Sequence, residues 1–150
     1  MTLSPISLET TNAIANCDNG YIEIRCVVNS ELVAEIIEIW LKRRDVNILS
    51  VSKDVAFEGN VLDYVSTLED TEIANRSGVV VSSLIRDVGV SYLSIRIMGS
   101  MLKPQKDKGP YQCELLGFDT NYGFIREDSR MDMLNITGNT KQFILIRPGL

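Results

Sequence analysis

Arginine, tyrosine and carboxylate side chains are the groups most able to do chemistry in this 150-residue chain, because it contains no histidine. Without imidazole there is no histidine-assisted nucleophile, no histidine general base and no histidine metal ligand. Neighbouring carboxylates such as Glu69 and Asp70 point apart on regular elements, and no glycine-rich phosphate loop occurs. We therefore expect a protein that has no cofactor or metal site and is not an enzyme. The enzymatic alternative is a histidine-free site in which Tyr92 or Tyr111 meets an arginine and a carboxylate.

Two arginines could converge on one anion. Arg25 and Arg96 both fall on the polar side of segments in which apolar and polar residues alternate, which is typical of strands. If those strands are neighbours in one sheet, the two guanidinium groups and Tyr92 form a site for a small anionic ligand. In the alternative interpretation the arginines pair with Glu23 or another acidic residue across the sheet.

Charge is distributed unevenly along the chain. Residues 1–72 carry thirteen Asp or Glu against five Lys or Arg, whereas residues 73–150 carry seven against ten. The net charge of −5 disfavours nucleic-acid binding. An alternative function follows from the acidic half, which could cover a basic protein partner's active site, as an inhibitor or immunity protein does. The residues predicted for that contact are Glu31, Glu35, Glu38, Glu69, Asp70 and Glu72.

The cysteines predict a reducing environment. Cys17, Cys26 and Cys113 form no CxxC pair, and an odd, sparse set is typical of cytoplasmic proteins. Cys26 lies in an apolar run and is interpreted as a small core residue. The first residues lack the basic and apolar blocks of a secretion signal, and no run of about 18 apolar residues occurs. We therefore expect a cytoplasmic protein without a membrane contact.

The elements that must position these groups begin after an irregular arm at residues 1–20. Residues 21–29 alternate between apolar and polar types and predict a strand. Residues 31–44 carry apolar residues three and four apart, which predicts an amphipathic helix with Trp40 on its buried stripe. Residues 46–51 are apolar and β-branched, and they predict a second strand.

A second unit of the same kind follows. Residues 61–67 are interpreted as a strand, with a short helix as the alternative. Residues 77–88 are interpreted as a helix that ends at Gly89, with a strand as the alternative because residues 79–81 are all valine. Residues 92–97 alternate cleanly and predict a strand. The order β, α, β, β, α, β over residues 21–98 is that of a ferredoxin-like α+β fold, an antiparallel sheet with two helices on one face.

The remaining residues predict an extension of this core. Residues 99–110 hold lysines, prolines and a glycine, and are interpreted as a solvated loop. Alternating apolar segments separated by turn residues over 111–150 predict a β-meander that packs on the ferredoxin-like core.

The string IEIRCVVNSELVAEIIEIWLKRRDVNILSVSK at residues 22–53 resembles the opening of an ACT-type regulatory domain. In that family a strand leads into an amphipathic helix, here striped by Val33, Ile36 and Trp40, and then into a strand such as VNILSV. The resemblance implies a ferredoxin-like fold, dimerisation through side-by-side sheets, and an amino-acid ligand beside a glycine that follows the first strand. This chain has VNSE at residues 28–31 in place of that glycine.

Together these features predict a cytoplasmic, non-enzymatic regulatory module that forms a homodimer. Its partner would be either a small anionic ligand, bound at Arg25, Arg96 and Tyr92, or a protein. The acidic inhibitor and the histidine-free enzyme are the alternatives.

Overall fold

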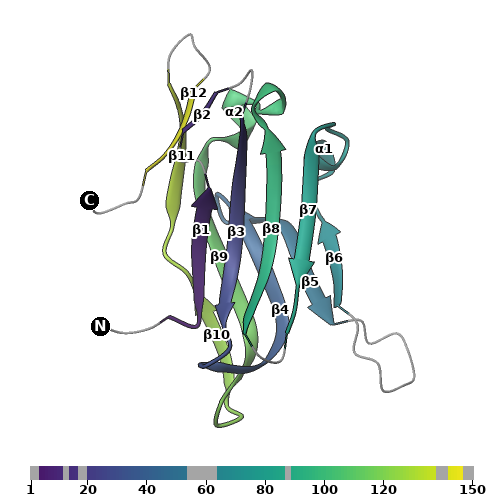
Figure 1. Cartoon of the computed structure of the whole chain (residues 1–150), viewed down its shortest axis with the longest axis vertical. Coiled ribbons are helices and arrows are strands. Elements are labelled where there is room, and N and C mark those ends of the chain that lie inside the picture. The colour runs from purple at the N-terminus through teal and green to yellow at the C-terminus, as the bar shows by residue number, and fades with distance from the viewer. Residues whose placement is uncertain are drawn as a thin grey trace.

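Two antiparallel β-sheets packed face to face form the molecule in the computed structural model, which describes residues 4–11, 14–16, 20–53, 64–86, 89–137 and 142–146 (Figure 1). Helical structure in these residues is limited to short turns: α1 (Thr71–Ala74), α2 (Pro104–Asp107) and a 3-10 turn at Gly99–Met101. None of these helices is long and apolar enough to cross a membrane.

Sheet A has four strands in the order β1-β3-β8-β7. They are β1 (Ile6–Thr11), β3 (Tyr21–Asn29), β8 (Val90–Met98) and β7 (Val79–Leu84). On β3 every second side chain from Ile22 to Val28 is buried in the core. The intervening side chains point to the outer face, because successive residues of a strand face opposite sides of the sheet.

Sheet B has the strand order β2-β12-β11-β9-β4-β5-β6, and β10 pairs with β9. Its strands are β2 (Ile14–Asn16), β12 (Gln142–Ile146), β11 (Asp132–Thr137), β9 (Gly109–Asp119), β4 (Val33–Arg43), β5 (Val46–Lys53), β6 (Tyr64–Leu68) and β10 (Phe124–Asp128). Both β10 and β11 pair with β9, at its C-terminal and N-terminal halves respectively.

The predicted ferredoxin-like α+β fold is wrong, and so is the fold implied by the ACT-type resemblance. The first predicted helix contains β4 and the second contains β7, and these two strands belong to different sheets. The predicted strands overlap β3, β5, β6 and β8. The C-terminal residues also form strands, but β9 lies beside β4 within sheet B and does not pack on a separate core.

Two β-bulges explain why β4 has the spacing of a helix. The partner on β9 changes by one residue while β4 advances by two, first between Val33 and Glu35 and again between Ile36 and Glu38. Each bulge inserts one residue and reverses the alternation of side chains. The buried side chains of β4 are therefore Val33, Ile36, Ile39 and Leu41. The first three are spaced three apart, as apolar residues are on one face of a helix.

A glycine on β9 accommodates the first bulge. A Cβ atom on Gly117 would collide with the carbonyl oxygen of Glu35 on β4. Glycine permits this close approach of two backbones because it has no side chain.

The second predicted helix fails because its first residues favour extended backbone. Val79, Val80 and Val81 are β-branched, and such side chains pack well on a pleated sheet. β7 forms the edge of sheet A, where Val80 points outward and is 59% exposed. Gly89 has a φ of +96° and begins the turn into β8, so it does not end a helix.

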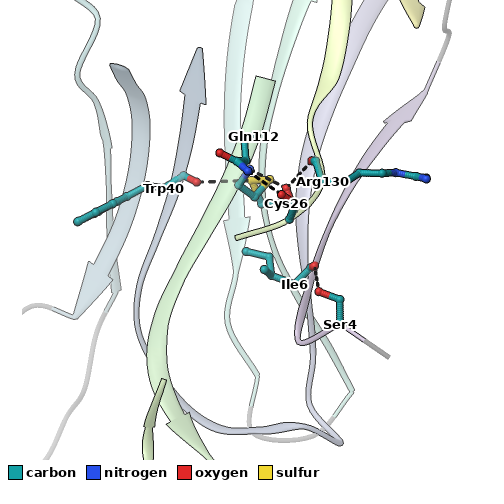
Figure 2. Close-up of a disulfide and its surroundings, with 8 residues drawn as sticks. Ser4, Ile6, Cys26, Trp40, Gln112 and Arg130 are labelled. Atoms are coloured by element: carbon teal, nitrogen blue, oxygen red, sulfur yellow. Dashed lines mark hydrogen bonds between the residues drawn. A yellow bond between two sulfur atoms is a disulfide. The ribbon is translucent and has the colours of Figure 1, made fainter. Parts of the chain in front are cut away.

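A disulfide crosses the core between the sheets. Cys26 of β3 is bonded to Cys113 of β9, which ties sheet A to sheet B (Figure 2). Cys26 is buried as predicted, but it is not a free thiol. Disulfides persist in oxidising compartments, which argues against the reducing environment predicted from the cysteine count. Cys17 lies outside the described residues.

The predicted irregular arm contains strands. β1 pairs with β3 at the edge of sheet A, and its side chains Ile6 and Leu8 are buried in the core. β2 pairs with β12 in sheet B. The first residues of the chain therefore contribute to both sheets.

Candidate functional site

The predicted anion-binding residues lie together on the outer face of sheet A. β3 and β8 are hydrogen-bonded neighbours, and a row of outward side chains crosses them in the order Tyr21, Arg96, Glu23, Arg25 and Tyr92. Glu23 bonds both guanidinium groups, with N···O distances of 3.1 Å to Arg25 and 3.1 Å to Arg96. Each guanidinium also stacks over a ring at 4.2 Å, Arg25 on Tyr92 and Arg96 on Tyr21. We call this row the arginine ladder.

Both arginines of the ladder already have a carboxylate partner. Glu23 is only 7% exposed, although it points away from the core, because the flanking side chains cover it. These are the cross-sheet pairs of the alternative interpretation. An anion at Arg25, Arg96 and Tyr92 would compete with Glu23 for both guanidinium groups, so anion binding there stays a prediction.

The acidic residues of the inhibitor hypothesis do not form one surface. One group extends from the turn before β4 to the middle of that strand, and within it Glu35 is paired with Lys53. The other group lies at α1, where Asp70 pairs with Arg43 at the opposite end of β4, 2.9 Å away. The first group is Glu31, Glu35 and Glu38, and the second is Glu69, Asp70 and Glu72.

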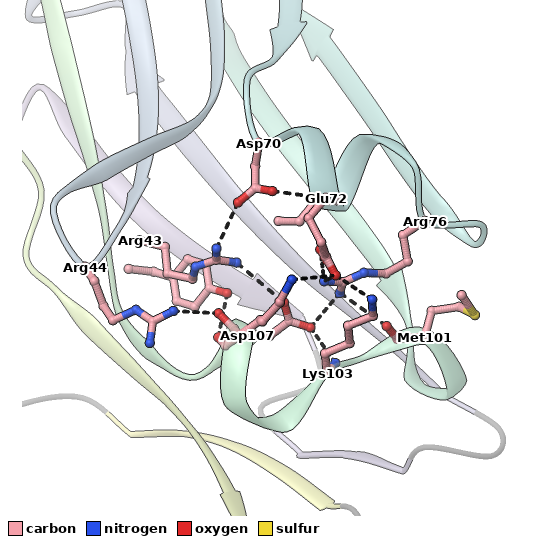
Figure 3. A network of polar contacts seen from close by, with 11 residues as sticks. Arg43, Arg44, Asp70, Glu72, Arg76, Met101, Lys103 and Asp107 are labelled. Atoms are coloured by element: carbon pink, nitrogen blue, oxygen red, sulfur yellow. Dashed lines mark hydrogen bonds and ion pairs between the residues drawn. The ribbon is translucent and has the colours of Figure 1, made fainter.

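Charged residues near α1 form a network that joins the two sheets (Figure 3). Asp107 is fully buried and bonds Arg76 at 2.6 Å and Arg43 at 3.4 Å. Arg76 precedes β7 of sheet A, whereas Arg43 and Asp107 belong to β4 and to the turn before β9 of sheet B. Glu72 bonds Arg76 at 2.5 Å and Lys103 at 2.6 Å. The network therefore links sheet A to sheet B at one end of the sandwich.

The network favours the charged forms of Glu72 and Arg76. Partial burial tends to raise the pKa of Glu72, but hydrogen bonds from Lys103 and Arg76 outweigh it and lower the pKa to about 2. Burial tends to lower the pKa of Arg76, but its bonds to Asp107 and Glu72 raise it above the ordinary value. A carboxylate held by two cations is a poor general base, so we interpret the network as structural.

Tyr111, one candidate of the enzymatic alternative, belongs to this structural region. It is 1% exposed, and its hydroxyl donates to the carbonyl oxygen of Asp107 at 2.7 Å. Burial raises the pKa of the phenol, and the negative charge of Asp107 raises it further. The Tyr111 hydroxyl is therefore buried and hydrogen-bonded, and a substrate cannot reach it. The other candidate, Tyr92, is covered by Arg25 in the arginine ladder.

Trp40 lies on the outer face of sheet B, whereas it was predicted on the buried stripe of an amphipathic helix. It stands between Ile39 and Leu41, both fully buried, and therefore points the opposite way. Figure 2 shows its side chain directed away from the disulfide. Its register partner on β9 is Glu114, which also faces outward.

Apolar side chains of β9 and β10 surround this tryptophan position. Leu116 pairs with Arg126, and Phe118 pairs with Phe124, on the same side of the sheet as Trp40. The rings of Phe118 and Phe124 meet edge to face at 6.1 Å, and the Arg126 guanidinium lies 6.0 Å from the Trp40 ring. We call these five residues the aromatic face: Trp40, Leu116, Phe118, Phe124 and Arg126.

A carboxylate anchors the arginine of the aromatic face. Glu114 is 3% exposed and bonds Arg126 at 3.0 Å and Lys42 at 3.7 Å. Burial tends to raise the pKa of Glu114, but the hydrogen bond from Arg126 and the charge of Lys42 lower it. The pKa of nearby Asp128 is raised by burial and by the charge of Glu114. Glu114 is therefore charged at neutral pH and holds Arg126 over the sheet.

The aromatic face was not predicted, although part of its signal is in the sequence. Phe118 and Phe124 flank the turn residues Asp119 to Gly123, a spacing that fits a hairpin with paired aromatic side chains. Tyr111 stands two residues before Cys113, the second cysteine of the disulfide. A tyrosine at this position is typical of one class of β-sandwich.

No protein-family model matches this chain, and no curated protein matches it. Among solved structures, murine CRIg matches 89% of this chain and 98% of its own, with a TM-score of 0.55 and 17% identity. The likeness shows a shared fold, and the disulfide between the sheets and the Tyr111 hydroxyl bond agree with it. One feature differs, because Leu41 faces Cys113 where antibody domains pack a tryptophan on the disulfide. The chain therefore has an immunoglobulin-like β-sandwich fold.

Proposed function

We propose that this chain is a non-enzymatic interaction module that binds protein through the aromatic face. The observation that carries the proposal is the exposure of a large apolar side chain on a sheet of paired strands. Phe124 is 59% exposed beside Phe118 and Leu116, and Tyr122 at the adjacent turn is 77% exposed. Aromatic and arginine side chains supply most binding hot spots in protein interfaces, and clustered apolar exposure marks such sites.

The disulfide supports an oxidising compartment as the place where the module works. Thiols of cytoplasmic proteins are kept reduced, so the disulfide between Cys26 and Cys113 would stay formed only in an oxidising compartment. This replaces the cytoplasmic location that was predicted from the cysteine count.

A second copy of the chain is the partner that we propose, in line with the predicted homodimer. Arg126, Leu116 and Glu38 lie side by side across β10, β9 and β4. We place the two-fold axis in the interface, parallel to β9 and over Leu116. This axis brings β10 of one copy opposite β4 of the partner subunit. In a face-to-face dimer, Arg126 of one copy then meets Glu38 of the partner subunit, and the reverse pair forms as well.

Sedimentation velocity across the micromolar range tests this dimer. We expect a mass that rises with concentration for the natural chain and a monomer for Phe124→Asp, because a buried carboxylate without a partner opposes association. Val80→Asp is the matched control, since Val80 is also 59% exposed but lies on sheet A. This variant is expected to associate as the natural chain does.

Charge exchange tests the two-fold arrangement. Arg126→Glu and Glu38→Lys are each expected to weaken the dimer about ten-fold, because each places like charges together. The double variant restores opposite charges across the axis and is expected to recover the dimer. A chain that stays monomeric throughout, a Phe124→Asp variant that still dimerises, or a double variant no better than the singles would contradict the proposal.

A further inference from the structure

A separate cavity opens at the end of the sandwich where β4 begins, and it has a volume of about 490 Å³. Its walls come from the turn between β3 and β4, the start of β6, the segment after β7 and the turn between β9 and β10. Small-molecule sites in proteins typically enclose roughly 300–1,000 Å³. The cavity lies at the opposite end of β4 from the charge network, whose β4 member is Arg43.

Within the described residues, the lining of this cavity carries one positive charge without a carboxylate partner. Three charged side chains among these residues line it, and two of them, Glu35 and Lys53, pair with each other. The third is Arg86, whose guanidinium forms no ion pair within the part of the chain that the structure describes. A guanidinium without a carboxylate partner favours an anion at this position.

Hydrogen bonds hold the polar walls in place. The Ser91 hydroxyl, on a residue only 2% exposed, accepts from the Arg86 amide at 2.9 Å and donates to the Arg86 carbonyl at 3.3 Å. The Tyr64 hydroxyl donates to the carbonyl of Ile36 at 2.7 Å. A wall that is ordered before the ligand arrives lowers the entropy cost of binding.

Apolar side chains lie beside these polar groups. Val28, Val33 and Ile36 are buried core residues at the base of the lining, whereas Ile85 is half-buried and Tyr122 is exposed. We propose that the cavity binds a small organic carboxylate with a compact apolar body. The carboxylate pairs with Arg86 through charge-assisted hydrogen bonds, and the body packs against Ile85 and Tyr122. This site shares no residue with the aromatic face or with the arginine ladder as defined above.

Two probes of equal shape separate charge from apolar packing. Indole-3-acetate carries one carboxylate on an aromatic body, and indole-3-acetamide is its neutral counterpart. Titration of the ¹⁵N-labelled chain is expected to shift the amide resonances of Arg86, Ser91 and Ser30 with the carboxylate. The neutral amide is expected to bind about ten-fold more weakly, because a charge-assisted bond becomes a neutral one.

Matched arginine variants locate the site. Arg86→Gln is expected to weaken indole-3-acetate about ten-fold, whereas Arg126→Gln, the same substitution on the aromatic face, leaves its affinity unchanged. Unaltered amide dispersion confirms that each variant is folded. The proposal is wrong if the probe causes no shifts, if the shifts map to the aromatic face, if acid and amide bind equally, or if the two variants behave alike.

Discussion

The two outer faces of the sandwich use the same residue types in opposite ways. In the arginine ladder each ring lies 4.2 Å from a guanidinium, and the central Glu23 is 7% exposed. On the aromatic face Arg126 lies 6.0 Å from Trp40, and Phe124 is 59% exposed. Aromatic and arginine side chains stabilise their own sheet when they stack and pair with one another. Where they remain exposed, they are available to a partner.

Register causes this difference. On sheet A, Glu23 is directly opposite Arg96 and two residues from Arg25, so one carboxylate bonds both cations. On sheet B, the buried Glu114 bonds Lys42 and Arg126, and the phenylalanines of the neighbouring pair have only each other. Similar residue types therefore pair with one another in the arginine ladder, whereas on the aromatic face they leave an apolar side chain exposed to a partner.

Removal of the disulfide should break both faces together, and it has the largest expected effect. Cys26→Ala combined with Cys113→Ala releases the bond between β3 and β9. We expect a loss of about 2–5 kcal/mol in the free energy of unfolding, measured by urea denaturation. The natural chain in reductant should lose a similar amount. Equal stability with and without reductant would show that the bond does not form.

Substitution of the central carboxylate should affect the arginine ladder alone. Glu23→Gln removes the carboxylate that bonds both guanidinium groups, and we expect a cost of about 1–3 kcal/mol in urea denaturation. Dimerisation should be unchanged. Glu31→Gln, in the exposed turn before β4, is the control and should stay within about 0.5 kcal/mol. A Glu23→Gln variant as stable as this control would contradict the ladder's structural role.

Low pH should weaken the charge network, which depends on the ionised carboxylate of Glu72, but not the apolar contacts of the aromatic face. The pKa of Glu72 is about 2 in the folded chain against 4.5 as its ordinary value, so the folded state favours the charged form. Its contribution to stability is complete above pH 4.5 and is lost as the pH falls toward 2. Glu72→Gln should therefore be less stable than the natural chain near neutral pH, by a margin that shrinks in this window. A margin that is constant with pH, measured by thermal unfolding, would disprove this role.

The aromatic face should give the smallest change in stability. Phe124→Asp replaces a side chain that is already exposed, so we expect unfolding free energy within about 0.5 kcal/mol of the natural chain. The same variant is expected to lose dimerisation. It is the reverse of Glu23→Gln, which should lower stability and leave association intact. A large loss of stability for Phe124→Asp would mean that the two faces do not differ as described.

Local pattern predicted the strands whose alternation is uninterrupted. The period of two over residues 21–29 and 92–97 corresponds to β3 and β8, and their pairing places Arg25 and Arg96 on one face with Glu23. β4 was mistaken for a helix because its two bulges space the buried residues three apart. β7 was mistaken because the apolar residues over 77–88 fit a helical stripe as well as an edge strand.

The composition and alternation of the chain determined by themselves that histidine chemistry is absent, that β3 and β8 are strands, and that Arg25 and Arg96 each lie on the polar side of their own strand. Only the tertiary structure decided that Cys26 bonds Cys113 and that Trp40 faces outward. The reason is that a strand's partner is distant in sequence. The register with that partner, including any bulge, determines which side chains enter the core and which remain open to another molecule.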